Sequence, residues 1–140
     1  MGSFRNLVQE RRSHRQFTGE PVKEEDVRTI LRAALMAPTA KNKRLWDFVV
    51  TRDRDKLEDL SSVRTGGSGF LAGADLAIAV AGSPKENDMW IEDASIAAVT
   101  MQYQIQDLGL GSCWCQIRLR ESSEEGKSAS QAVKDILGIE

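Results

Sequence analysis

Apolar residues recur along the chain at spacings typical of helices. Between residues 24 and 37 they return every third or fourth position, and three acidic residues occupy the first turn, where the helix dipole favours negative charge. Pro38 ends this helix because the residue before a proline is biased away from helical backbone. The same spacing predicts further helices over residues 3–12, 55–62, 89–108 and 128–137.

Two other segments carry strand-like patterns. Residues 46–51 are rich in β-branched and aromatic side chains, and residues 75–81 are apolar after Asp75, as expected of a strand covered on both faces. Residues 17–22 and 112–120 are predicted to be extended or strand. Helices and strands are interleaved without strict βαβ alternation, so the pattern favours a single α+β domain over residues 1–140.

Composition places the chain among soluble globular proteins. Its 140 residues suffice for one compact domain, and 41% are hydrophobic and 29% charged. The net charge of −2 gives no argument for a nucleic-acid or membrane partner. Residues 1–56 nevertheless carry a net charge of +5 and the remainder −7. Two interpretations stay open: solvated helix faces, or an N-terminal part that holds an anion.

Targeting and cysteine patterns favour a cytoplasmic protein. No stretch is long enough to span a bilayer, and Met1–Arg5 lack the basic segment that opens a signal peptide. Cys113 and Cys115 are too few for a disulfide framework, and His14 is the single histidine, so we expect no metal site. Buried, inert cysteines are the favoured interpretation of these two.

A cluster of arginines marks the end of the first predicted helix. Arg11, Arg12, Ser13 and Arg15 place three guanidiniums and a hydroxyl within five residues. Arginine binds phosphate in a bidentate manner, and serine adds a short hydrogen bond. An exposed basic helix end is the alternative, because cations also favour a helix C-terminus.

Two polar loops are the other candidates. The loop from Pro38 to Trp46 holds Asn42, whose amide can pair with a heterocycle that presents a donor beside an acceptor; a helix-stop loop with solvated lysines is the alternative. The segment 109–116 contains GxG but follows a helix, so it fails the context test for a dinucleotide fingerprint.

Hydrolase chemistry is disfavoured, because His14, the single candidate base, lies among arginines.

Three segments, taken in order, resemble the flavin-dependent nitroreductase family. They are Arg11–Phe17, Ala37–Phe48, and the stretch from Glu92 to Trp114 that contains Leu-Gly-Leu-Gly-Ser-Cys-Trp. The similarity covers essentially the whole chain. It implies an α+β fold with a central mixed or antiparallel sheet flanked by helices, and FMN bound at the interface of an intertwined homodimer.

The resemblance also implies roles for individual residues. Arg11, Ser13 and Arg15 would hold the FMN phosphate, ribityl chain and pyrimidine edge, with Arg12 nearby. Pro38, Thr39, Ala40 and Asn42 would form the loop that reaches a flavin bound mainly by the other subunit. Trp114, Cys115 and Gln116 align with the segment that passes over the isoalloxazine, and Arg64 is a candidate for the middle contacts. No side chain would be catalytic in itself, and Arg15 would stabilise the negative charge of the reduced flavin.

The implied activity is that of an oxidoreductase. Hydride from NADH or NADPH would pass through FMN to a nitroaromatic, quinone or similar acceptor. Reductive dehalogenation on the same fold, or a non-catalytic or degenerate flavin- or nucleotide-binding module, are the alternatives. Family members usually continue into a further strand and a C-terminal segment, whereas this sequence stops at Glu140. One chain of this length is not expected to enclose a flavin alone, so the resemblance predicts a homodimer with two shared sites.

Overall fold

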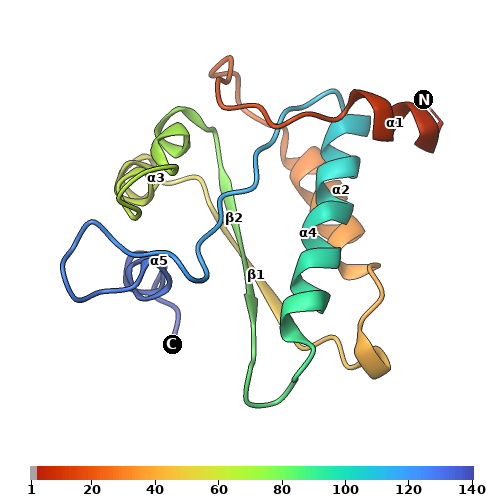
Figure 1. Ribbon diagram of the computed structural model, residues 1–140. Coiled ribbons are helices and arrows are strands. Elements are labelled where there is room, and N and C mark those ends of the chain that lie inside the picture. Colours follow the sequence, from red (N-terminus) through yellow and green to blue (C-terminus); the bar gives the residue numbers. More distant parts are fainter. Residues whose placement is uncertain (1–2) are drawn as a thin grey trace. The chain divides into compact units, whose positions relative to one another are not determined.

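A computed structural model describes residues 3–140 (Figure 1). Met1 and Gly2, part of the segment compared with signal peptides above, lie outside the described residues. The helices and short 3₁₀ turns are α1 (Phe4–Glu10), α2 (Glu24–Leu35), η1 (Ala40–Asn42), α3 (Arg54–Ser61), η2 (Gly69–Gly73), α4 (Trp90–Asp107) and α5 (Ala129–Leu137). The strands are β1 (Trp46–Thr51) and β2 (Ala77–Gly82).

The described chain divides into two compact units. The first contains residues 3–14, 22–49 and 79–113, and the second contains residues 15–21, 50–78 and 114–140. Strands β1 and β2 pair in a two-stranded sheet and run in opposite directions (Figure 1). Each strand contributes residues to both units. Helices with a small antiparallel sheet confirm the α+β class, and the prediction of a single domain remains a prediction.

The core of the first unit is the contact between α2 and α4. Val27, Ile30 and Ala34 of α2 are buried, and Ala97 and Met101 of α4 are buried opposite them. Alanine at these positions lets the two helix backbones approach closely. Helix α1 packs on α4 as well (Figure 1). The rings of Phe4 and Tyr103 meet edge to face at a centroid distance of 5.2 Å.

The second unit is built around α3. Leu57 of α3 and Ala129 of α5 are completely buried, and α3 contacts both η2 and α5. Arg54, at the start of α3, donates hydrogen bonds to the carbonyls of Ala72 (2.6 Å) and Ala74 (2.9 Å), which fixes η2 and the turn before β2. The N-cap Asp53 accepts from the N–H groups of Asp55 and Lys56, so α3 begins where its sequence provides a cap.

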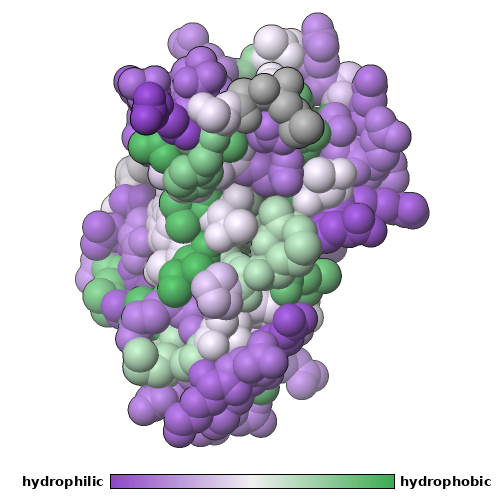
Figure 2. Space-filling model, turned by 90° about the vertical axis from the view of Figure 1, so that its right-hand side faces the viewer, coloured by the Kyte–Doolittle hydropathy of each residue, from purple (hydrophilic) through white to green (hydrophobic). Residues whose placement is uncertain are grey.

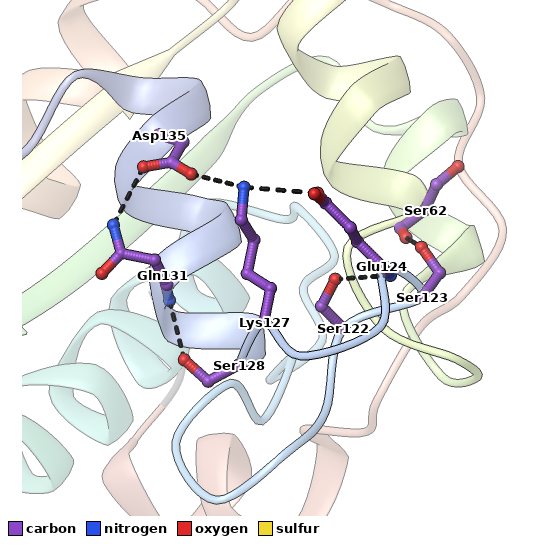
Figure 3. A network of polar contacts seen from close by, with 8 residues as sticks. All are labelled: Ser62, Ser122, Ser123, Glu124, Lys127, Ser128, Gln131 and Asp135. Atoms are coloured by element: carbon purple, nitrogen blue, oxygen red, sulfur yellow. Dashed lines mark hydrogen bonds and ion pairs between the residues drawn. The ribbon is translucent and has the colours of Figure 1, made fainter.

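A polar network holds α5 (Figure 3). The ammonium of Lys127 lies 2.7 Å from a carboxylate oxygen of Asp135 and 3.2 Å from one of Glu124. The Ser123 hydroxyl donates to the carbonyl of Ser62 at 2.7 Å, so the segment before α5 is tied to the end of α3. Hydrogen bonding to Lys127, supported by Gln131, holds the pKa of Asp135 below its ordinary 3.8.

Most predicted elements agree with the structure to within a few residues. The predicted strand 46–51 matches β1, whereas the second strand lies at Ala77–Gly82 rather than 75–81. The segment 112–120 forms no strand; within residues 3–140 its pairing consists of an isolated parallel bridge between Ser13 and Ser112. Leu119 has a φ of 65°, in the left-handed region, which is incompatible with a continuous strand at its end. Among the described residues, no helix has the length and apolar character needed to cross a membrane.

We expect Gly82→Ala to destabilise the protein, because an alanine Cβ there would lie 2.7 Å from Cε3 of Trp90. Overpacking of this kind costs about 1–3 kcal/mol, measurable by urea unfolding. Gly73→Ala is the matched control, since its Cβ would meet nothing within 4 Å. Equal unfolding free energies for the two variants would contradict the close packing of Gly82 on Trp90.

The ion pair at α5 makes a prediction about pH. A carboxylate whose pKa is lowered by folding stabilises the protein above its unfolded pKa, and this contribution is lost as the pH falls through the lowered folded pKa. Asp135→Asn should therefore lose less unfolding free energy than the unsubstituted protein when the pH is lowered below 3.8. Urea unfolding along a pH series measures this, with Glu125→Gln on the exposed loop as the control. Identical acid profiles for all three proteins would count against the pair.

Candidate functional site

Backbone pairing fixes the arginine cluster at the end of α1. The Ser13–Ser112 bridge lies in the first unit, and the His14 N–H donates to the Ser112 carbonyl at 2.9 Å. The segment therefore lies beside the loop that follows α4. Gly111 packs closely there: a Cβ would lie 3.2 Å from Cδ2 of the His14 ring, so the ring would have to move by a few tenths of an ångström to admit one.

The arginines of the cluster differ in what they bind. Arg12 donates to the carbonyls of Gln9 (2.8 Å) and Arg11 (2.7 Å), so its guanidinium closes the C-terminal end of α1. Neither Arg11 nor Arg15 forms an ion pair with a carboxylate of residues 3–140. The helix-end interpretation thus applies to Arg12, while Arg11 and Arg15 keep their guanidiniums available to an anion.

The second candidate loop has an unusual backbone. After α2 ends at Leu35, the chain forms η1 over Ala40–Asn42, and Lys41, Asn42 and Arg44 have positive φ values of 54°, 55° and 56°. Asparagine tolerates this region, but each of the other two costs about 1–2 kcal/mol. Side chains of the loop hold it: the Thr39 hydroxyl accepts from the Arg44 N–H (3.2 Å), and the Asn42 carbonyl oxygen accepts from the Arg44 Nε–H (3.3 Å).

Asp93 anchors the same loop from α4. Its carboxylate accepts a hydrogen bond from the Ala40 N–H at 2.9 Å, and the side chain is 3% exposed. The sequence placed Asp93 in a family motif but gave it no role in the site. An acidic residue in the first turn of a helix is expected simply because the helix dipole favours negative charge there. The sequence pattern therefore gave no sign that Asp93 bonds to the distant Ala40 N–H.

Trp46 leaves a buried donor in the same unit. The residue is 8% exposed, its ring lies at a centroid distance of 5.1 Å from that of Phe48 with the two planes tilted by 50°, and its Nε1–H has no hydrogen-bond partner among the described residues. A buried donor left in this way costs about 1–3 kcal/mol. The indole N–H is therefore available to a polar group from outside the described chain.

The third candidate segment is divided between the units: residues 109–113 belong to the first unit, and Trp114, Cys115 and Gln116 belong to the second. Trp114 is 44% exposed, and its Nε1–H donates to the Gln116 side-chain oxygen at 3.0 Å, while Gln116 donates to the Arg118 carbonyl at 2.9 Å. The Cys115 sulfur lies 4.0 Å from the Gly67 carbonyl oxygen. Both cysteines are only half-buried, so the expectation that they are buried is wrong.

The predicted site residues therefore fall into two groups. Arg11, Arg12, Ser13, Pro38, Thr39, Ala40 and Asn42 belong to the first unit, and Arg15, Arg64, Trp114, Cys115 and Gln116 belong to the second. Within residues 3–140 no group of three or more His, Cys, Asp or Glu side chains is arranged to hold a metal ion. The candidate residues of the first unit supply cationic and hydrogen-bonding groups of the kind that suit an organic anion.

The described residues form an α+β protein whose candidate residues carry cationic and hydrogen-bonding groups. The family model "Nitroreductase family" matches residues 8–63. A protein of Archaeoglobus fulgidus named "Putative NADH dehydrogenase/NAD(P)H nitroreductase" is 35% identical over 137 residues, which cover 95% of this chain and 75% of that protein. The chain belongs to the nitroreductase family, and with it to the oxidoreductases.

Solved structures agree with this assignment. An FMN-dependent nitroreductase from Clostridium difficile R20291 superposes with a TM-score of 0.92 at 43% identity, covering 96% of this chain and 78% of that chain. A nitroreductase-like chain from Desulfovibrio desulfuricans in complex with FMN has a TM-score of 0.73 at 28% identity, covering 81% of this chain and 68% of that chain. The nitroreductase-like fold is confirmed.

Proposed function

We propose that this protein is an FMN-dependent oxidoreductase that takes hydride from NADH or NADPH and reduces nitroaromatic, quinone or similar acceptors. The observation that carries the proposal is the segment Arg11–Arg15. Two of its guanidiniums form no ion pair with a carboxylate of residues 3–140, and Ser13 lies between them in the sequence. Similarity to the FMN-dependent nitroreductase of Clostridium difficile supports the choice of FMN as the anion.

The residues present fit FMN by the chemistry of their donors. A phosphate needs cations and short hydrogen bonds, which Arg11, Arg15 and Ser13 provide. The pyrimidine edge of a flavin presents both acceptors and a donor, which suits the Asn42 amide and the Thr39 hydroxyl. Pro38, Ala40, Trp114, Cys115 and Gln116 complete the proposed contact set, and Arg12 supports it by closing α1.

The protein's part in the proposed reaction is electrostatic and positional. FMN, when bound, supplies the hydride chemistry. Arg15, at the pyrimidine edge, would offset negative charge that develops there on reduction. Trp114, locked by its hydrogen bond to Gln116, would limit the space over the ring and exclude water.

We also propose that the active form is a homodimer with two shared sites, in which each chain forms one domain. We propose the cytoplasm as its location, because NADH and NADPH are available there. An open groove of about 420 Å³ in the first unit supports the dimer. It is lined by residues of α1, of α2 and the stretch that follows it, and of α4, among them Leu7, Met36, Pro38 and Tyr103. Met36 is 68% exposed and Phe4 64%. Figure 2 views the right-hand side of Figure 1, where α2 and α4 are drawn, and shows hydrophobic residues among hydrophilic ones on this face.

The first test is the visible spectrum of the purified protein. We expect it to bind added FMN and to be bleached by NADH or NADPH under anaerobic conditions, with colour restored by a nitroaromatic or a quinone. Failure to take up FMN would defeat the flavin proposals altogether. Bound FMN that neither nicotinamide reduces would favour the alternative of a non-catalytic flavin-binding module.

Arginine substitutions test the cluster itself. Arg11→Ala and Arg15→Ala each remove a charge-assisted hydrogen bond of about 1.5–3 kcal/mol, so each should raise the FMN dissociation constant roughly tenfold to a hundredfold. Arg15→Ala should also slow flavin reduction. Fluorescence titration and stopped-flow reduction measure these effects, with Arg28→Ala on the exposed face of α2 as the control. Unchanged affinity and unchanged reduction in Arg15→Ala would refute its role.

A further inference from the structure

Both oxygens of one buried carboxylate are engaged by separate segments of the first unit. Asp93 Oδ1 accepts from the Ala40 N–H at 2.9 Å, and Asp93 Oδ2 accepts from the Asn87 Nδ2–H at 2.9 Å. Asn87 is itself 4% exposed, and its Oδ1 accepts from the Met89 N–H at 3.0 Å. The carboxylate therefore joins the Thr39–Arg44 loop to the turn that starts α4.

The charge of Asp93 has no cation to balance it. No ion pair links Asp93 to a lysine, arginine or histidine of residues 3–140, so its partners are neutral N–H groups at the positive end of α4. Burying a carboxylate in this way is unfavourable unless its hydrogen bonds are well made. An apolar residue would fill the space without that desolvation penalty, but it would not hold the Ala40 N–H.

The backbone held by Asp93 is one that would otherwise relax. Lys41, Asn42 and Arg44 all have φ in the left-handed region directly after Ala40, and the side chains of Lys41, Lys43 and Arg44 are exposed, so burial does not fix them. Strained backbone persists only where surrounding contacts determine it. The bond from Ala40 to Asp93 is the contact that reaches this loop from a distant element, since the bonds to Thr39 and Asn42 are local.

We propose that Asp93 is a positioning residue that holds the Thr39–Arg44 loop in its flavin-binding conformation. The inference rests on the proposed function, because it takes Thr39, Ala40 and Asn42 to be flavin contacts. Asn87 assists Asp93: its hydrogen bond to Oδ2 fixes the orientation of the carboxylate, so that Oδ1 faces Ala40.

Exchanging the two side chains provides the test. An asparagine at position 93 has one acceptor oxygen for two donors, so Asp93→Asn leaves either the Ala40 N–H or the Asn87 amide unpaired. Asn87→Asp alone sets two carboxylates against each other. The double variant, Asn87→Asp with Asp93→Asn, keeps total charge and shape. It leaves a side-chain oxygen at position 93 to accept from the Ala40 N–H, and it restores the bond between the two side chains with donor and acceptor exchanged. Glu92→Gln removes a charge from the same turn at an exposed position and serves as the control.

Two measurements, neither of which depends on enzymatic activity, report separately on the conformation of the Thr39–Arg44 loop and on its contribution to FMN affinity. Limited digestion of the flavin-free protein with trypsin, followed by mass spectrometry, reports opening of the loop at Lys41, Lys43 and Arg44. Fluorescence titration with FMN reports affinity. In Asp93→Asn we expect cleavage at these sites and the FMN dissociation constant each to rise about tenfold, as for the loss of one buried hydrogen bond. The double variant should recover both, and Glu92→Gln should change neither.

The possible failures are distinct. Unchanged cleavage in Asp93→Asn, or a double variant that recovers neither reading, would overturn the positioning role. Faster cleavage with unchanged FMN affinity would overturn the link between this loop and the flavin. If the unsubstituted protein binds no FMN, the proposed function fails, and the cleavage series still decides whether Asp93 holds the loop.

Discussion

The close contact between α2 and α4 is the constraint on which the first unit depends. Alanines at the interface bring the two backbones together, and everything that borders the candidate site in this unit is attached to one helix or the other. The arginine segment lies beside the loop that leaves α4, through Ser13 and Ser112, and the Thr39–Arg44 loop leaves α2 and is bonded to the first turn of α4. A shift of α4 along α2 would therefore displace both the end of the arginine segment at Ser13 and the Thr39–Arg44 loop, which contain proposed flavin contacts.

The exposed ion pairs of Lys127 and the buried hydrogen bonds of Asp93 have different roles in this protein. The pairs around Lys127 are solvent-exposed, and such pairs contribute little energy, so they define where α5 docks rather than how stable the unit is. Asp93 is buried and carries its charge without a cation, so each of its two hydrogen bonds matters more. We infer that the buried carboxylate is kept for position, because an apolar residue would satisfy the packing alone.

The candidate site was partly readable from sequence. Arginine spacing predicted an anion-binding segment, which stays a prediction, and the order of three motifs identified the family, which the Archaeoglobus relative confirms. The spacing did not distinguish Arg12 from its neighbours, because the bonds of Arg12 to two backbone carbonyls arise only when α1 ends in this geometry. Asp93 was missed as a site residue for a similar reason: its partner Ala40 is a backbone N–H far away in the chain, and any residue type could supply it.

The sequence by itself determined the elements whose causes are local. Helical periodicity, the caps at Asp53 and Ser128 and the stop at Pro38 set the helices to within a few residues, and β-branched residues set β1. Tertiary structure decided what depends on distant partners. Residues 112–120 are extended in character yet form no strand, since a strand needs a neighbour along its length and this segment pairs at Ser112 alone before turning at Leu119. The left-handed backbone of Lys41 and Arg44 could not be predicted either, because neither residue favours it. The loop is held by bonds to Thr39 and Asn42 within it and by the bond from Ala40 to the distant Asp93.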